Sequence, residues 1–569
     1  MNRRSSLAVL LGKKEKTAPK ARTTTLGTLA PYTGTWSYEQ AAHLLRRSMY
    51  GPTYAQINQA VADGLQLTID QLFLPQPLPA EPIHFYNNPD PDASIGQTWV
   101  NGGIPDNPEV FNARARSLFG WTYKTICESG VSIQEKMTLF WHNHFVVSDI
   151  TLAQWTYRYI TFLRENALGN FKTLTEGITI DESMLEYLNG NLNTKEAPNE
   201  NYARELLELF TVGKGELAGP GDYTTFTEQD VVEIARCLTG WLSLNPITFE
   251  LTPTFLNFRH DTGTKQLSHR FGNAVITNEG ENEYKKVIDI IFQQDEPARF
   301  ISRKIYRWFV HDNINSDVEI NIIEPMAQLI LDNDWEIEPA VRALLSSNHF
   351  YENAQIGCTV AHPIDFFFKL LRSTNVPMPT SENDKYALMS RLFFATEDLE
   401  MVMYYPPSVA GWKAFYQEPQ FSKFWINGAT LPVRMRYSDG ITLGVPIETF
   451  PNQTFHLGID VIALAASLDN PSDPNELILE FSKILFPNPV DQGQLDVLKD
   501  VLIPGLPDFE WTVEYSDFAS GNTSLEESVK LKLKLLISTM LKMPEFYFCL
   551  LYTSPSPRDR TRSRMPSSA

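Results

Sequence analysis

Residues 199–211 read NENYARELLELFT and combine a dense polar face with an apolar one. At about 100° per residue, the polar side chains fall within an arc of roughly 140°, and the apolar side chains cover the opposite side. The polar set consists of Glu200, Asn201, Arg204, Glu205 and Glu208. This division predicts an amphipathic helix, with Asn199 as its N-cap because it follows a proline and can accept a backbone hydrogen bond.

Two interpretations of this polar face are open. Glu200, Arg204 and Glu208 are each four residues apart, so they can form ion pairs along a solvated helix. Alternatively, the carboxylates line a cleft in which they act as acid and base or bind a divalent metal ion. The candidate catalytic residues on this helix are Arg204, Glu205 and Glu208, with Glu205 also a candidate metal ligand, and the candidate binding residues are Asn199, Glu200 and Asn201.

A second helix is predicted directly after this one. Thr227-Glu228-Gln229-Asp230 has the spacing of a capping box, in which the first and last side chains bond each other's backbone N–H groups. The helix is expected to end at Gly240, before Trp241, which is a candidate binding residue.

His142 and His144 lie in the sequence FWHNHF at residues 140–145. On a helix, residues two apart point about 200° away from each other, so both could bind one ion only on a strand or loop. The preceding residues look helical, which favours two separately hydrogen-bonded histidines. His142 is retained as a candidate catalytic residue and His144 as a candidate metal ligand.

Two further segments contain candidate binding residues. His260 and Asp261 form a turn in which the carboxylate could orient the imidazole or bond the backbone. Trp412 follows Pro406-Pro407 in an aromatic, rigid segment that could shape a pocket wall or close the core.

Helical patterns recur along most of the chain. They cover residues 37–47, 54–64, 110–171, 284–293, 298–309, 322–332, 337–346, 363–373, 384–399, 427–437 and 528–541. Residues 247–260 alternate in polarity and are expected to pair with residues 266–271. The expected fold is mainly α, a multi-helix globular array with a minor β-hairpin near residues 247–271.

The domain organisation follows from changes in composition. Residues 1–35 are expected to be a disordered basic arm, residues 36–440 the main helical domain and residues 441–548 a smaller helical region. The tail at residues 549–569 is basic and rich in Ser and Pro, and we interpret it as non-native sequence, so that the native C-terminus would be missing.

The bulk composition excludes several classes of protein. The chain has 569 residues and a net charge of −20, which favours solubility and argues against non-specific binding to nucleic acid. The sequence lacks an apolar run long enough for a transmembrane helix. Its four cysteines lack zinc-site spacing and are expected to be buried thiols. Arg3 and Arg4 weakly resemble a twin-arginine export signal, so the location could be cytoplasmic or exported.

Several segments, in the same order, resemble the bacterial family catalogued as domain of unknown function 1800. They are residues 41–47 with Gly51, 140–145, Asp181 with 184–185 and 187–188, 199–206, Tyr223 with 227–231, 238–241, 260–261, 406–412 and 425–427. The resemblance covers residues 37–440 well. It implies a largely helical protein without an established activity. It also implies a sulfatase-like partner protein, and export signals in many members.

Two functions remain open from the sequence. One is metal-assisted hydrolysis at a polar cleft built from Glu200, Arg204, Glu205 and Glu208 with His142 or His260. The other is a non-catalytic scaffold that acts with a sulfatase-like protein. The sequence does not decide whether the protein is an enzyme.

Overall fold

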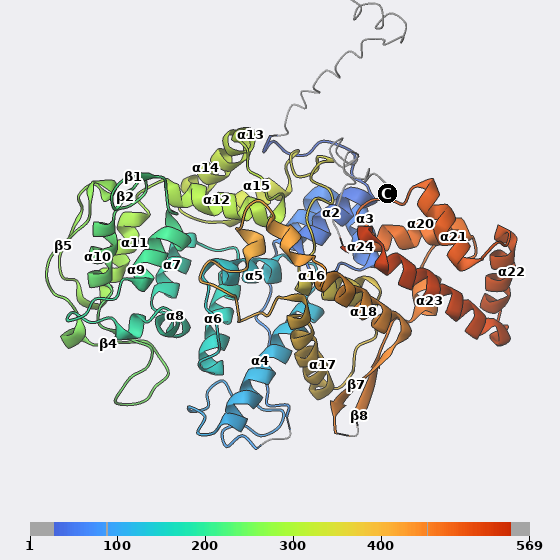
Figure 1. The fold of residues 1–569 in the computed structure, drawn as a ribbon, viewed down its shortest axis with the longest axis horizontal. Coiled ribbons are helices and arrows are strands. Elements are labelled where there is room, and N and C mark those ends of the chain that lie inside the picture. The colour runs from blue at the N-terminus through green and yellow to red at the C-terminus, as the bar shows by residue number, and fades with distance from the viewer. Residues whose placement is uncertain (1–27, 87–88, 452, 548–569) are drawn as a thin grey trace, which may run out of the picture.

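The computed structural model describes residues 28–86, 89–451 and 453–547 as an array of helices with short two-stranded hairpins (Figure 1). The predicted fold class is therefore confirmed. Most of the expected basic arm, the tail at residues 549–569 and Cys549 lie outside the described residues. Among the described helices, none combines the length and the apolar character needed to cross a bilayer.

The helices of the first half follow the predicted order. They are α2 (Tyr38–Ser48), α3 (Tyr54–Leu72), α4 (Pro108–Glu128), α5 (Gln134–His144), α6 (Ala153–Glu165), α7 (Phe171–Thr179), α8 (Glu182–Tyr187), α9 (Asn201–Glu205), the π-helical segment η2 (Leu206–Thr211) and α10 (Glu228–Cys237). Helix α3 continues past its predicted end. Gly64 has a φ of 80°, so it kinks the helix rather than ending it.

The second half is also helical. Its helices are α11 (Glu283–Ile291), α12 (Glu296–Phe309), α13 (Ser316–Val318), the π-helical segment η6 (Glu319–Ile323), α14 (Glu324–Asp332), α15 (Glu338–Leu345), α16 (Pro363–Ser373), α17 (Glu382–Ala395), the short η8 (Lys413–Phe415) and η9 (Phe421–Trp425), α18 (Thr430–Leu443), α19 (Val461–Ala466), α20 (Pro474–Leu485), α21 (Gln492–Leu502), α22 (Asp508–Ala519), α23 (Glu526–Lys542) and α24 (Pro544–Tyr547).

The hairpins differ in part from the prediction. The antiparallel pairs are β1 (Leu217–Gly219) with β2 (Asp222–Tyr223), β3 (Trp241–Leu242) with β4 (Thr254–Phe255), β5 (Lys265–Gln266) with β6 (Val275–Ile276), and β7 (Val445–Phe450) with β8 (Gln453–Leu457). Most of the predicted strand at residues 247–260 is a loop, because Phe249 has a φ of 58° and Ile247 is 84% exposed. Only β4 lies within it, and β4 pairs with residues before it rather than after it.

One connected set of buried apolar side chains runs from α2 to α24. Phe119 of α4 stacks on Phe393 of α17 with ring centroids 3.9 Å apart, and these two helices lie side by side in Figure 1. Phe366 of α16 contacts Phe546 of α24, with ring centroids 6.0 Å apart. Helices from both sides of residue 440 thus pack together, and the domain division there stays a prediction.

Gly51 allows the end of α2 to lie directly against α16. Its φ is 51°, and a Cβ atom at this position would lie 2.2 Å from the carbonyl oxygen of Phe368. Only glycine fits both constraints. This close approach fixes the end of α2, whose last turn contains Arg46 and Arg47, against α16.

Candidate functional site

The helix at residues 199–211 is present, but it changes character at Leu206. Helix α9 is α-helical, and η2 continues it as a π-helix, in which Thr211 Oγ1 donates to the Leu206 carbonyl at 2.5 Å. Asn199 Oδ1 accepts a hydrogen bond from the N–H of Asn201 at 3.0 Å. The N-cap position itself belongs to Glu200, so the predicted cap is wrong by one residue.

The polar face of this helix is largely engaged in ion pairs. Arg204 lies 3.1 Å from Glu200 and 2.7 Å from Glu228 of α10. Glu208 does not continue this row: the change to i→i+5 bonding rotates it, and it pairs with Lys214 at 3.0 Å. Glu205 is half-buried, and its pKa is raised by burial and then by Glu208.

The two histidines of α5 have separate environments. His142 is fully buried: its Nδ1 lies 2.9 Å from Tyr159 Oη, and its Nε2 accepts from the Tyr404 N–H at 3.2 Å. Burial lowers the pKa of His142 to about 3. Its ring centroid lies 5.8 Å from that of Trp412, so the structure brings these two candidates together. The Nδ1 atom of His144 instead lies 3.0 Å from Lys304 Nζ.

The candidate binding residues His260, Asp261 and Trp241 contact residues of α10, α11 and the small hairpins. His260 Nδ1 lies 2.8 Å from the Thr239 carbonyl, and its Nε2 lies 3.1 Å from Glu283 Oε2. Asp261 forms an ion pair with Arg236 at 2.8 Å. The ring of Trp241 packs against Phe255 and Tyr284 of neighbouring elements. These contacts hold the neighbouring elements together around the buried pair of His260 and Glu283.

Metal-ligating side chains do not gather in the part of the chain that the structure describes. Within it, no group of three or more His, Cys, Asp or Glu side chains is placed to hold a metal ion. His144 and Glu205, the candidate metal ligands, each lack such a group of neighbours.

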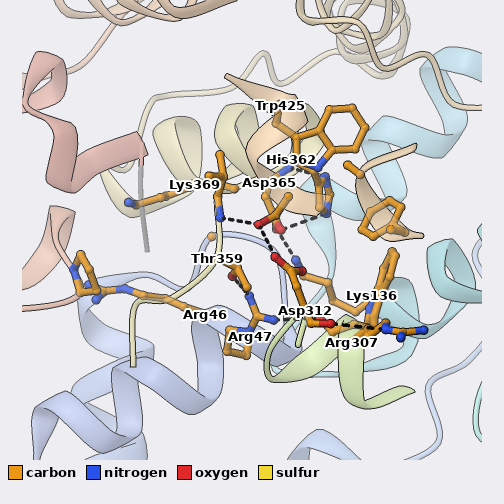
Figure 2. A pocket seen from close by; sticks show the side chains of 18 of the residues that line it. Arg46, Arg47, Lys136, Arg307, Asp312, Thr359, His362, Asp365, Lys369 and Trp425 are labelled. Atoms are coloured by element: carbon orange, nitrogen blue, oxygen red, sulfur yellow. Dashed lines mark hydrogen bonds and ion pairs between the residues drawn. The ribbon is translucent and has the colours of Figure 1, made fainter. Parts of the chain in front are cut away.

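A different site lies where α2, α5, α12, α16, η8, η9 and α24 meet. We call it the basic pocket, a cavity of about 80 Å³ whose polar lining includes Arg46, Arg47, Lys136, Arg307, Asp312, Thr359, His362, Asp365, Lys369 and Ser422 (Figure 2). Aromatic rings of Trp308, Phe415, Trp425 and Phe546 complete the wall. Five basic side chains thus face two acidic ones, on a chain whose net charge is −20.

Arg46 and Arg47 are adjacent in sequence and reach the ends of two different helices. Arg47 donates to the carbonyls of Trp308 and Phe309 at the end of α12, both at 2.8 Å, and to the hydroxyl of Thr359. Arg46 donates to the carbonyl of Phe486, after the end of α20, at 2.7 Å. Carbonyl and hydroxyl oxygens orient the Arg47 guanidinium but carry no full negative charge, so they leave its positive field in place.

Lys136 and His362 surround Asp365. Lys136 forms an ion pair with Asp365 Oδ1, and His362 Nε2 lies 2.9 Å from Oδ2. Burial alone would raise the pKa of Asp365, but His362 and Lys136 hold it well below its usual range. Burial lowers the pKa of His362. Asp365 therefore stays ionised and neutralises Lys136.

Arg307 and Asp312 form the opposite side of the basic pocket. Arg307 donates to the backbone carbonyl of Asp312 at 3.4 Å, its only hydrogen bond to the described residues, and burial lowers its pKa. Asp312 Oδ2 accepts from Ser422 Oγ at 3.1 Å. Burial raises the pKa of Asp312, and Ser422 and Arg47 oppose this rise. Four of the five N–H donors of Arg307 thus make no hydrogen bond to the described residues.

The sequence analysis did not identify this site. Its residues come from segments scattered between residues 46 and 546, and no local pattern joins them. The available signal was the family resemblance, because Arg46, Arg47, Gly51 and Trp425 lie in the segments that carry it and also line the pocket.

A sequence model of the family described as "Protein of unknown function (DUF1800)" matches residues 43–548. The matched region includes the segments that line the basic pocket. Neither a curated protein nor a solved structure matches the chain.

Proposed function

The chain belongs to the DUF1800 family, as its sequence motifs predict, and we propose that its basic pocket binds the anionic group of a small ligand. The observation that carries this proposal is the set of five basic side chains around one cavity on an acidic protein. Arginine and lysine side chains that converge on a concave site are typical of sites for phosphate, sulfate and carboxylate groups.

The fixed positions of the cations support binding over a merely solvated cluster. Arg47 is held by two carbonyls and a hydroxyl, and Lys369 Nζ donates to the carbonyl of Phe546 at 2.9 Å. Side chains that are already ordered lose little conformational entropy when a ligand binds. An anion would therefore meet donors that need little rearrangement.

The size of the cavity and its aromatic wall limit the ligand. About 80 Å³ is well below the roughly 300–1,000 Å³ of pockets that enclose drug-sized ligands. Trp308 and Phe415 have ring centroids 4.6 Å apart, and Phe415 and Trp425 have centroids 5.9 Å apart. The cavity thus suits a compact oxyanion, and the rest of a larger ligand would pack on the aromatic rim.

Thermal melting in a series of anions tests the proposal. Phosphate, sulfate and acetate are compared with chloride at the same ionic strength, because a ligand that binds only the folded state raises Tm. We expect at least one oxyanion to raise Tm in the wild type. Arg307→Gln should lose most of this rise, since it removes the least engaged guanidinium. Arg436→Gln, at a 68% exposed side chain, is the matched control and should keep it.

Absence of a rise with every anion would overturn the proposal. An equal rise in the wild type and in Arg307→Gln would also overturn it, because the anion would then bind elsewhere on the surface.

The functions suggested by the sequence have less support. Metal-assisted hydrolysis at Glu205 and Glu208 would need a nearby histidine with an available nitrogen. Both ring nitrogens of His142 are hydrogen-bonded within the protein, and Glu208 is paired with Lys214. A scaffold that acts with a sulfatase-like protein remains a proposal that the basic pocket does not address. Binding of an anion is compatible with an enzyme and with a binding protein.

A further inference from the structure

Asp312 is an acidic side chain placed among the cations of the basic pocket. Figure 2 shows its carboxylate in the same cluster as Arg47, Lys136 and Arg307. An acidic group repels an anionic ligand, so its presence in an anion site calls for a chemical reason.

The two aspartates of the pocket differ in their partners. Both oxygens of Asp365 lie against basic groups, Lys136 and His362. Asp312 forms no ion pair within the described part of the chain, and its side-chain partner is the Ser422 hydroxyl at 3.1 Å. An ionised carboxylate has about four lone-pair sites, so Asp312 keeps capacity to accept further hydrogen bonds.

Oxyanions differ in whether they can donate to such an acceptor. Inorganic phosphate carries at least one P–OH group near neutral pH, and a phosphate monoester carries one in its singly protonated form, with a second pKa of about 6. Sulfate has no proton at neutral pH, and neither does a sulfate monoester. A carboxylate acceptor therefore gains a hydrogen bond from a protonated phosphate and meets only repulsion from sulfate.

We propose that Asp312 makes the basic pocket selective for a protonated phosphate group over sulfate. The cations hold the phosphate oxygens, and the P–OH group donates to Asp312. This inference rests on the proposed anion binding and adds its ligand class and a residue that determines specificity. The burial that makes Asp312 a more basic acceptor strengthens the hydrogen bond that it accepts.

Isothermal titration calorimetry at pH 7 with inorganic phosphate and with sulfate tests this assignment. We expect the wild type to bind phosphate at least tenfold more tightly than sulfate. In Asp312→Asn the repulsion is lost and the amide can donate, so sulfate should gain affinity and the ratio should fall to within about threefold. Arg307→Gln is the matched control, which should weaken both anions while keeping the ratio.

Phenyl phosphate distinguishes the two sources of a phosphate group. If the natural ligand is a monoester, phenyl phosphate at pH 5.5, where much of it is singly protonated, should bind more tightly than inorganic phosphate because its ring can pack on the aromatic rim. Weaker binding identifies inorganic phosphate as the better ligand, and both results keep the role of Asp312.

Wild-type protein that binds sulfate and phosphate equally would overturn the role of Asp312 and leave anion binding intact. The same holds if Asp312→Asn keeps the wild-type ratio. Wild-type protein that binds neither anion would also overturn the role of Asp312, and it would overturn the proposed function as well if acetate fails to raise Tm. The ratio of phosphate to sulfate affinity in the wild type tests the role of Asp312 even if Asp312→Asn does not fold.

Discussion

Lys304 Nζ lies 3.0 Å from His144 Nδ1, and the two side chains together hold the π-helical segment η2. Lys304 donates to the Leu209 carbonyl at 2.9 Å, and His144 Nε2 donates to the Phe210 carbonyl at 3.0 Å. A π-helix leaves carbonyls at its end without helical partners, and these two side chains supply the missing donors. His144, a candidate metal ligand from the sequence, thus has a structural contact at both nitrogens.

Lys304 predicts a pH dependence of stability. Burial lowers its pKa from 10.5 to about 7, so between pH 7 and pH 10.5 the unfolded chain binds more protons at this residue than the folded chain does. Stability should therefore rise with pH in this window and be lowest below pH 7, where both states are protonated. Between pH 7 and pH 9, the free energy of unfolding of the wild type should rise relative to that of Lys304→Met. The rise should be on the order of 1 kcal/mol, less than a fully buried lysine would give, because Lys304 is only partly buried.

Urea unfolding of both proteins at pH 7, 8 and 9 measures this gain. A stability difference that stays constant, or that shrinks as pH rises, would contradict the buried state of Lys304.

Gly51→Ala should destabilise the protein strongly. The added Cβ would meet the Phe368 carbonyl oxygen at 2.2 Å, and the φ of 51° disfavours alanine in any case. We expect a loss of about 2 kcal/mol or more in the free energy of unfolding. Gly505→Ala is the matched control, since its φ is also positive at 64° but nothing lies within 4 Å of the new atom. Equal losses in the two variants would show that α2 does not lie as closely against α16.

Arg164 and Glu135 form a buried bidentate pair between α6 and α5, with contacts of 2.7 and 3.0 Å. Arg164→Met should cost about 3–5 kcal/mol because it leaves the Glu135 carboxylate buried without its partner. Adding Glu135→Leu should recover most of this loss, since the unpaired charge is then removed. Chemical denaturation of the single and double variants measures both effects, and a double variant as unstable as the single one would contradict a buried pair.

Divalent metal ions should leave the stability unchanged. The described residues contain no group of His, Cys, Asp and Glu side chains placed to hold a metal ion. Melting in the presence of Mg²⁺, Mn²⁺ or Zn²⁺, and after EDTA treatment, should therefore give the same Tm. A rise with one of these ions that is lost in Glu205→Gln would revive metal-assisted hydrolysis at α9.

Local features of the fold could be predicted from the sequence because their contacts are close in sequence. Thr227 and Asp230 form the predicted capping box, and Asp181 Oδ1 accepts from the Met184 N–H at 3.0 Å as the cap of α8. The register change at Leu206 was missed because an angle of 100° per residue assumes α-helical bonding throughout. The pairing of Trp241 with Phe255 was missed because it depends on a tertiary contact that alternation alone does not specify.

The candidate site was harder still to predict from the sequence, because its contacts join segments that are far apart in the chain. The ion pairs of Arg204 with Glu200 followed from helical spacing, whereas its pair with Glu228 joins two helices. In the basic pocket, Arg47 and Arg307 are 260 positions apart in the sequence, and only folding brings them to one cavity. The net charge of the whole chain, −20, even argues against an anion-binding site, because an overall charge does not reveal that basic side chains gather at one place.

The location of a bound anion tests the central claim most directly. Arsenate is a protonated analogue of phosphate with an anomalous signal, so diffraction from crystals grown with it would place the anion by its arsenic atom. We expect a peak in the basic pocket within hydrogen-bond reach of Arg47, Arg307 and Asp312. A pocket without such a peak, in crystals whose arsenate binds only at other surface positions, would contradict it.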